Sequence, residues 1–408
     1  MEKQHFYREA RHDLAGPLAG VRVLEIATTW AGPMCACLLA DFGADVIKVE
    51  HPEGDVARRS PPLLPGTDPP VSFMHATVNR NKRSLTLDVR RAEGRALFLR
   101  LAARSDVVIE SFRPGVADAF GIGWEAIRGV RPGAIYVSIS GFGQFGPDCE
   151  RPGYDPLAQA ASGWLSLNGD PGGSPVKAPT FLGDDLAGLH AALAVLAALR
   201  HRDLTGEGQH VDVSLLDAML FQSPGFLTLG ALGVDLPRLG NEFRIAAPAN
   251  CYRARDGFVM AGVLLDSQWR RLVALLGRPE LGAHPDFATT PARLARRGEV
   301  DRLLGAWIAS RDADAAAREL SGAGVPAAAV RSYAEAARDP HVRERDMLQE
   351  VPLGGRSVPV VGPAAKLSRT PTRVRSAAPE LGAHAAEILR ELGIGDAEAR
   401  RLREAGVV

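Results

Sequence analysis

Two neighbouring acidic residues stand just before the longest apolar run of the chain. They are Asp184 and Asp185 in GDDLAG, and the run Ala191–Leu199 follows them. Spacing alone favours helix capping, because Asp is a preferred residue at a helix N-terminus. The alternative is that one carboxylate is a nucleophile, which a helix N-terminus would keep ionised and supply with hydrogen-bond donors. Both interpretations predict one buried helix from about residue 183 to residue 202.

Three other sets of residues have both a chemical and a structural interpretation. Tyr154 and Asp155 in RPGYDP are either an ionisable pair or a core Tyr beside a turn Asp. His190 lies on the apolar helix and is expected to be packed rather than catalytic. Cys35 and Cys37 lie in an apolar helical stretch, where free Cys behaves as a small hydrophobic residue.

The segment GFGQFG (141–146) matches the GxGxxG pattern of dinucleotide-binding proteins. That fingerprint needs a helix immediately after it, and Pro147 and Pro152 oppose one. Gly141 and Gly143 still permit a close approach of the backbone to some ligand. The turn TTWAGP (28–33) is either an ordinary Thr-capped turn or an anion site at a helix start.

Short apolar segments alternate with helical patterns through the first part of the chain, which predicts an α/β fold with a parallel sheet. The expected strands are 21–27, 44–50, 84–89, 106–112 and 134–143, and the expected helices include 32–42 and 90–105. A smaller α/β module is expected farther on, with a strand at 257–263 and helices near 267–277 and 300–322. Ligands of such sheets bind at the carboxyl ends of the strands.

Composition excludes several classes of protein. The chain has 48 basic and 48 acidic residues, so a general nucleic-acid binder is not expected. Its four cysteines form no zinc pattern and no disulfide framework. The charged N-terminus does not resemble a signal peptide, and the longest apolar run is too short for a bilayer. We therefore expect a cytoplasmic protein with no metal, no nucleic-acid partner and no membrane partner.

The quoted motifs, in this order, resemble those of the class III (CaiB/BaiF) CoA-transferase family, which includes formyl-CoA transferase and the α-methylacyl-CoA racemases. The resemblance is carried by PLAGVRVLEIATTWAGP, LLADFGADVIKVEHPEGD, NRNKRSLTLDV, ESFRPGVADAFGIGWE, YVSISGFGQFGP, GDDLAGLHAALAVLAALRHRDLTGEGQHVDVSLLDA, GVPAAAV and LGAHAAEILRELG. Each motif alone is weak, but together they are specific and cover nearly the whole chain.

The resemblance implies a ring-shaped subunit that interlocks with a second copy into a homodimer. Residues 1–224 would form the first part of a large Rossmann-like domain, 225–332 a small α/β domain, and 333–408 a return to the large domain. The ligand would be a CoA thioester, which fits a Rossmann-like fold without a dinucleotide motif.

The resemblance also implies a reaction and its nucleophile. Asp184 would attack an acyl-CoA donor, pass through mixed anhydrides and an aspartyl-CoA thioester, and deliver CoA to a small carboxylic acid. Coenzyme A is then a substrate, and no permanently bound cofactor is needed. Asp185 would be a cap, and backbone N–H groups would stabilise the oxyanion.

The CoA contacts of the family carry over to positions at several predicted strand ends. These positions are Trp30, Ala31, His51, Leu87, Arg90, Ser111, Phe112, Arg113, Ser140, Gly141 and Phe142. Arg90, Arg113 and His51 have the charge or hydrogen-bonding groups to meet the CoA phosphates.

The sequence departs from well-known members at three places. Formyl-CoA transferases have Gln where Trp30 stands, and their glycine-rich GGGGQ loop is replaced by GNEFRIAAPAN (240–250). Racemases use His at the position of Tyr154, and Tyr, with a reference pKa of roughly 10, is a poor base near neutral pH. Three alternatives stay open: an acyl-CoA racemase or isomerase, a nicotinamide-dependent oxidoreductase, and a non-catalytic CoA-binding protein.

Overall fold

The computed structural model describes residues 2–67 and 70–408. The chain divides into two compact units. The first consists of 1–164, 177–228 and 340–408, and the second of 165–176 and 229–339. The domain boundaries expected after residues 224 and 332 stay predictions.

The first unit is built on a parallel sheet of six strands in the order β5-β2-β1-β6-β7-β8. The strands are β1 (Arg22–Ile26), β2 (Asp45–Glu50), β5 (Lys82–Thr86), β6 (Val107–Glu110), β7 (Ile135–Ser140) and β8 (Gln209–Ser214). The chain runs outward from β1 through β2 to β5, and then continues on the other side of β1 with β6, β7 and β8. The point where the order reverses, between β1 and β6, is where open α/β sheets bind their ligands.

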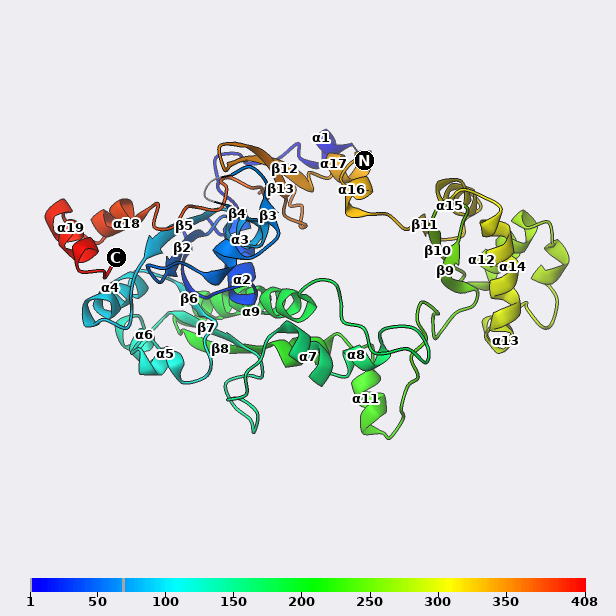
Figure 1. The fold of residues 1–408 in the computed structure, drawn as a ribbon, viewed down its shortest axis with the longest axis horizontal. Helices are drawn as coiled ribbons and strands as arrows, with labels where there is room; N and C mark the ends of the chain where they lie inside the picture. Colours follow the sequence, from blue (N-terminus) through cyan, green and yellow to red (C-terminus); the bar gives the residue numbers. More distant parts are fainter. Residues whose placement is uncertain (1, 68–69) are drawn as a thin grey trace. The chain divides into compact units, whose positions relative to one another are not determined.

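Helices cover both faces of this sheet, so successive strand residues enter different cores. Val23 packs in a core with α2 (Ala31–Asp41), α9 (Leu182–Thr205) and α10 (Leu215–Phe221). Leu24 packs on the other face with α4 (Ala92–Ala102), α18 (Ala385–Glu391) and α19 (Asp396–Glu404). Figure 1 shows the red C-terminal helices beside α4, so the end of the chain completes the first unit.

The second unit contains an antiparallel three-stranded sheet in the order β11-β10-β9. Its elements include β9 (Ala249–Arg253), β10 (Phe258–Gly262), β11 (Ala327–Ala329), α12 (Asp266–Leu275), α14 (Arg297–Ala309) and α15 (Ala313–Gly322). Trp269 lies at the centre of its apolar core and is covered by the buried guanidinium of Arg293. The single helix expected near 300–322 is two helices, separated at Ser310–Asp312.

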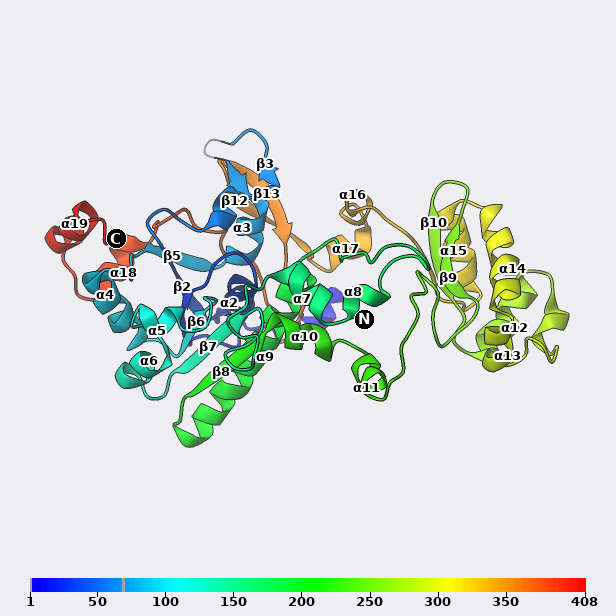
Figure 2. The ribbon, with the colours of Figure 1, turned by 60° about the horizontal axis from the view of Figure 1, so that its bottom comes forward.

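A hairpin that the sequence analysis did not predict belongs to the first unit. Its strands are β12 (Leu348–Leu353) and β13 (Arg356–Val361). Gly354 and Gly355 both have positive φ in the turn between them, which glycine adopts readily. Figure 2 shows the hairpin beside α3 (Phe73–Asn79), with which it shares a small apolar core.

The other elements are short. They are α1 (Lys3–Phe6), η1 (Val56–Arg59), β3 (Leu63–Leu64), β4 (Val71–Ser72), α5 (Val116–Ala119), α6 (Trp124–Val130), α7 (Asp155–Ala161), α8 (Trp164–Leu167), α11 (Phe226–Ala231), η2 (Pro279–Gly282), α13 (Thr290–Ala295), α16 (Tyr333–Ala336) and α17 (Pro340–Glu344).

Helix α9 matches the predicted long helix and is the one described helix that is long and apolar enough to cross a membrane. Its contacts are those of a core helix, because its buried residues pack with α2 and the sheet. His190 is half-buried, and its ring meets that of Phe221 at 5.0 Å. Cys35 and Cys37 are buried, and burial raises the pKa of both thiols, as expected of structural cysteines.

Candidate active site

A cleft with a volume of about 180 Å³ lies at the carboxyl edge of the sheet, at the switch point between β1 and β6. The turn after β1 contributes Thr28 and Thr29, the loop after β6 contributes Pro114, and α9 contributes Asp184. The cleft brings together most of the predicted contact residues, namely Trp30, Ala31, Ser111, Phe112, Arg113, Ser140 and Gly141. Residues far apart in sequence therefore meet where the topology predicts a ligand.

A second cleft, of about 260 Å³, shares Thr28 and Phe112 with the first. It contains the predicted residues His51, Leu87 and Arg90. Phe142 lines neither of these two clefts. Its ring lies instead under the guanidinium of Arg151, 5.0 Å away.

Asp184 lies in the first turn of α9 and is mostly buried. Burial, with the nearby charges of Asp155 and Asp185, raises the pKa of Asp184 to about 7. The expected effect of the helix terminus is thus outweighed by the surroundings of this carboxyl. Among the residues that the structure describes, none donates a hydrogen bond to its side chain. The carboxylate is left available to a bound molecule.

Asp185 has a different partner from the one that capping predicts. Its carboxylate accepts a hydrogen bond of 2.6 Å from the indole Nε1 of Trp30. Burial raises the pKa of Asp185, and this bond opposes the rise. The expectation that Asp185 caps its own helix is wrong, because its carboxylate binds the Trp30 indole instead of a backbone N–H of α9.

The start of α9 is capped from another helix. Asp155, at the start of α7, accepts from the backbone N–H of Gly183 at 2.7 Å and from Gln159 at 2.8 Å. Asp155 is 3% exposed, whereas Tyr154 lines the cleft and is 61% exposed. The residues of the predicted ionisable pair therefore have separate environments. The sequence contains no local signal for a cap supplied from 28 residues away.

Side chains below the sheet edge fix the loops of the cleft. The carboxylate of Glu110 accepts from the backbone N–H of Phe112 at 2.7 Å, and Ser111 Oγ accepts from Thr28 N–H at 3.0 Å. Gly141 lies so close to Gly153 that a Cβ atom on it would be 2.5 Å from the Gly153 Cα. The expected close approach at Gly141 is thus to another part of this chain. As predicted, no helix directly follows GFGQFG, since the next one is α7.

The second cleft carries the charged groups that were expected to meet phosphates. Arg90 contacts His51 and pairs with Asp88 at 2.8 Å. The hydrogen bond from Arg90 holds the pKa of Asp88 below its usual range. Arg113 lines the first cleft instead, so the three predicted cationic or hydrogen-bonding residues are divided between two adjoining spaces.

The arrangement defines an α/β protein with two adjoining clefts at a sheet edge and an available carboxylate, that of Asp184, in one of them. The chain matches CoA-transferase family III over residues 18–385. It therefore belongs to this family of enzymes and is a CoA-transferase, whose substrates are CoA thioesters and carboxylic acids.

Named relatives cover almost the whole chain. It is 37% identical over 386 residues to the succinate–glutarate CoA-transferase of Agrobacterium fabrum, covering 92% of this chain and 96% of that one. It is 36% identical over 388 residues to the succinyl-CoA:mesaconate CoA-transferase of Haloarcula hispanica, covering 93% and 97%. A crystal structure of a CaiB/BaiF family protein from Brucella suis is 37% identical, with a TM-score of 0.82, over 92% of this chain and 99% of that one.

Proposed function

We propose that this enzyme moves CoA from a dicarboxylic acyl-CoA, such as succinyl-CoA, to a second carboxylic acid, with Asp184 as the covalent nucleophile. The observation that carries the proposal is the contrast among three neighbouring carboxylates. Asp155 caps α9 and Asp185 holds the Trp30 indole, whereas Asp184 lines the cleft with its carboxylate available.

The proposed reaction consists of four acyl substitutions. The Asp184 carboxylate attacks the thioester carbonyl and the C–S bond breaks. This step releases CoA thiolate and forms a mixed anhydride between Asp184 and the donor acyl group. The thiolate then attacks the Asp184 carbonyl and releases the donor carboxylate, which leaves an aspartyl-CoA thioester. The acceptor carboxylate attacks that thioester, frees the thiolate and forms a second mixed anhydride. The thiolate finally attacks the acceptor carbonyl of this anhydride and forms the new acyl-CoA. Asp184 is regenerated with no net change in protons or electrons.

Each tetrahedral intermediate needs donors for its oxyanion. Ala31 lines the cleft at the N-terminus of α2, where backbone N–H groups have no partner within the helix. These N–H groups are the donors we propose, because the indole N–H of Trp30 is already bound to Asp185. Trp30 would thus act on the neighbouring carboxylate, in the place where formyl-CoA transferases have Gln.

We place the acyl end of CoA in the cleft of Asp184 and its nucleotide end in the adjoining cleft. Arg90 and His51 would meet phosphate groups there, and the apolar walls formed by Leu87 and Phe112 would cover the adenine or pantetheine. Arg113 would contact the part of CoA between the two ends.

A dicarboxylic substrate suits the charges of the first cleft. Arg151 is a second guanidinium among the lining residues, besides Arg113. We propose that Arg151 pairs with the carboxylate that does not react, since Arg binds carboxylates with strong charge-assisted bonds. The names of the relatives, which pair succinyl-CoA or succinate with mesaconate or glutarate, support the same substrate class.

The racemase alternative is less well supported. It needs a base and an acid on either side of the acyl α-carbon. The carboxylate of Asp155 is buried in its capping bonds, and Tyr154 is a phenol exposed to solvent. Neither group resembles a poised catalytic base.

We propose in addition that the chain acts as a cytoplasmic homodimer. Leu189 and Leu193, one turn apart on α9, are 48% and 64% exposed, and the neighbouring Phe221 is 73% exposed. Apolar side chains gathered in this way mark surfaces that another chain covers. The interlocked arrangement expected from the family would supply that chain.

The test is a transfer assay with succinyl-CoA as donor and a panel of mono- and dicarboxylic acids, with the acyl-CoA products identified by mass spectrometry. We expect new dicarboxylic acyl-CoA products that disappear in Asp184→Asn. Asp217→Asn, an exposed first-turn Asp of α10, is the matched control and should keep activity. Wild-type activity in Asp184→Asn would overturn the assignment of the nucleophile.

A further inference from the structure

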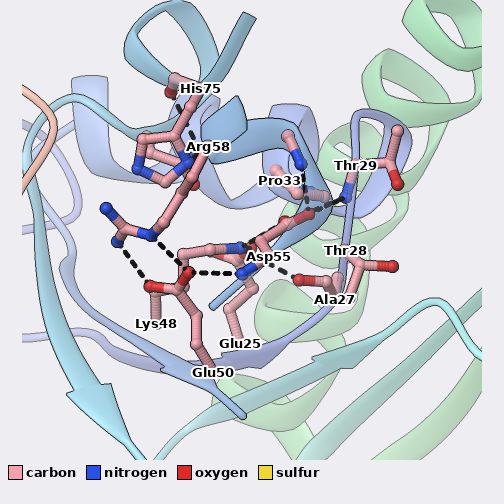
Figure 3. Close-up of polar contacts among 12 residues, drawn as sticks. Glu25, Ala27, Thr28, Thr29, Pro33, Lys48, Glu50, Asp55, Arg58 and His75 are labelled. Atoms are coloured by element: carbon pink, nitrogen blue, oxygen red, sulfur yellow. Dashed lines mark hydrogen bonds and ion pairs between the residues drawn. The ribbon is translucent and has the colours of Figure 1, made fainter. Parts of the chain in front are cut away.

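A cluster of buried charges lies beneath the turn that carries Trp30 (Figure 3). Glu25 on β1 is bound by two lysines, Lys48 on β2 at 3.0 Å and Lys82 on β5 at 2.6 Å. The three side chains have no solvent exposure. Asp55, which is 4% exposed, lies 3.5 Å from Lys48 and extends the cluster toward the cleft.

This cluster binds the backbone of the turn at three points. Lys48 Nζ donates to the carbonyl of Ala27 at 3.0 Å, and Lys82 Nζ donates to the carbonyl of Pro33 at 2.9 Å. Between them, the N–H of Thr29 donates to the carboxylate of Asp55 at 3.0 Å. The turn is therefore held at both ends and in the middle.

Thr29 needs such support. Its φ is +67°, in the left-handed region that β-branched residues rarely adopt. Trp30 follows directly and has its indole N–H on Asp185, the neighbour of the proposed nucleophile. A relaxed Thr29 would change the direction of the Trp30 side chain, and with it the contact on Asp185.

Buried ion pairs of this kind are a costly way to gain stability, because each charge loses its hydration. In this cluster the charged side chains form hydrogen bonds with backbone groups of one turn. Asp55 has a further bond that fixes its own position, since its Oδ1 accepts from Ala57 N–H at 2.9 Å. The N–H of Thr29 lies 3.0 Å from the other oxygen, Oδ2, and 3.3 Å from Oδ1, so both oxygens of this fixed carboxylate bind it.

We propose that Asp55 and Lys48 are positioning residues of the transfer reaction, which hold Thr29 in its left-handed conformation so that Trp30 binds Asp185 beside Asp184. The proposal rests on the proposed function for its kinetic consequence. Its structural consequence, the position of Trp30, can be measured without any activity.

The experiment compares Asp55→Asn with the matched control Asp41→Asn. An amide at position 55 replaces one carboxylate oxygen by an N–H donor. In the place of Oδ2 it removes the 3.0 Å bond from Thr29, and in the place of Oδ1 it removes the Ala57 bond and the 3.3 Å bond from Thr29. Asp41 is 1% exposed, pairs with Arg80 at 2.6 Å, and lies at the other end of α2 from Trp30. The control therefore removes a buried charge from the same unit without touching the turn.

The readouts are 19F NMR of protein labelled with 5-fluorotryptophan and steady-state kinetics. Trp30→Phe assigns the Trp30 signal, and Trp269 serves as an internal reference. In Asp55→Asn we expect the Trp30 signal to shift or broaden and kcat to fall about tenfold or more, with a smaller change in KM. In Asp41→Asn the Trp30 signal and kcat should stay near those of the wild type.

A folded Asp55→Asn protein with an unchanged Trp30 signal would overturn the proposal, whether or not transferase activity is found. An equal shift in Asp41→Asn would overturn it too, because the effect would then be general. If Asp55→Asn does not fold, the double variant Thr29→Gly/Asp55→Asn decides. Glycine adopts the left-handed conformation without the carboxylate, so recovered folding supports the proposal and continued unfolding overturns it.

Discussion

At the scale of single residues, the three carboxylates around the start of α9 differ in what they contact. Asp155 binds backbone, Asp185 binds an indole, and Asp184 faces the cleft. Only the last of these can approach a thioester without breaking a bond that the fold needs. The raised pKa of Asp184 makes its role depend on pH.

The first prediction concerns that pH dependence. The proposed nucleophile is the ionised carboxylate of Asp184, whose pKa is raised from the ordinary value of 3.8 to about 7. A raised acid pKa means that protonation persists up to near neutral pH, so activity is lost as pH falls through about 7. We expect kcat/KM for the donor to fall roughly tenfold per pH unit below that point and to be level above it. Initial rates between pH 5.5 and 8.5 test this, and a level profile throughout would contradict it.

The second prediction concerns substrate choice. Arg151→Gln should raise KM for dicarboxylic acceptors about tenfold and change KM for monocarboxylic acceptors little, because only the former lose a charge-assisted pair. Arg128→Gln is a matched control, since each arginine pairs at 2.8 Å with an acid three residues earlier and covers an aromatic ring. Equal effects on both acceptor classes, or in both variants, would refute the role of Arg151.

At the scale of elements, α7 and α9 are joined by the capping bond of Asp155. We predict that Asp155→Ala lowers the free energy of unfolding by about 2 kcal/mol, through the lost cap and the unsatisfied N–H of Gly183. Asp312→Ala, an exposed N-cap position whose side chain makes no capping bond, should change it by less than about 0.5 kcal/mol. Urea denaturation of both variants measures the difference, and equal losses would contradict the capping role.

The sheet and its helices could be predicted because buried parallel strands and amphipathic helices leave local patterns. The strand β5 begins two residues earlier than the predicted 84–89. The prediction omitted its first residues because they are charged, and the pattern does not show that Glu25, Pro33 and Asn79 supply partners to buried Lys82. The hairpin of β12 and β13 was missed although Gly354 and Gly355 mark its turn.

In the candidate site, too, some features could be predicted from the sequence and others could not. The strand-end positions could be placed because topology brings strand ends together, and the family resemblance supplied their roles. The partners of Asp185 and Asp155 could not be predicted from local patterns. Asp185 binds Trp30, which precedes it by 155 residues, and Asp155 binds Gly183, which follows it by 28 residues. Likewise, nothing in the sequence indicates that Phe142 turns toward Arg151.

At the scale of the whole molecule, the first unit places its two adjoining clefts along one sheet edge, which suits a long thioester such as an acyl-CoA. We propose that a second chain covers the exposed Leu189 and Leu193 on α9. We predict a dimer in analytical ultracentrifugation, and a shift toward monomer in Leu193→Glu, because a charge replaces an apolar contact. Val130→Glu, an exposed apolar position on α6, is the control. A monomeric wild type, or an unaffected Leu193→Glu dimer, would contradict the proposed homodimer.

We propose that Asp184 carries CoA covalently during transfer. The most direct measurement is mass spectrometry of enzyme quenched after mixing with succinyl-CoA and no acceptor, read on the peptide that contains Asp184. We expect a CoA or succinyl adduct on Asp184 that is absent in Asp184→Asn and disappears when an acceptor acid is added. Full transfer activity with the Asp184 peptide unmodified at every quench time, or an adduct on another residue, would contradict it.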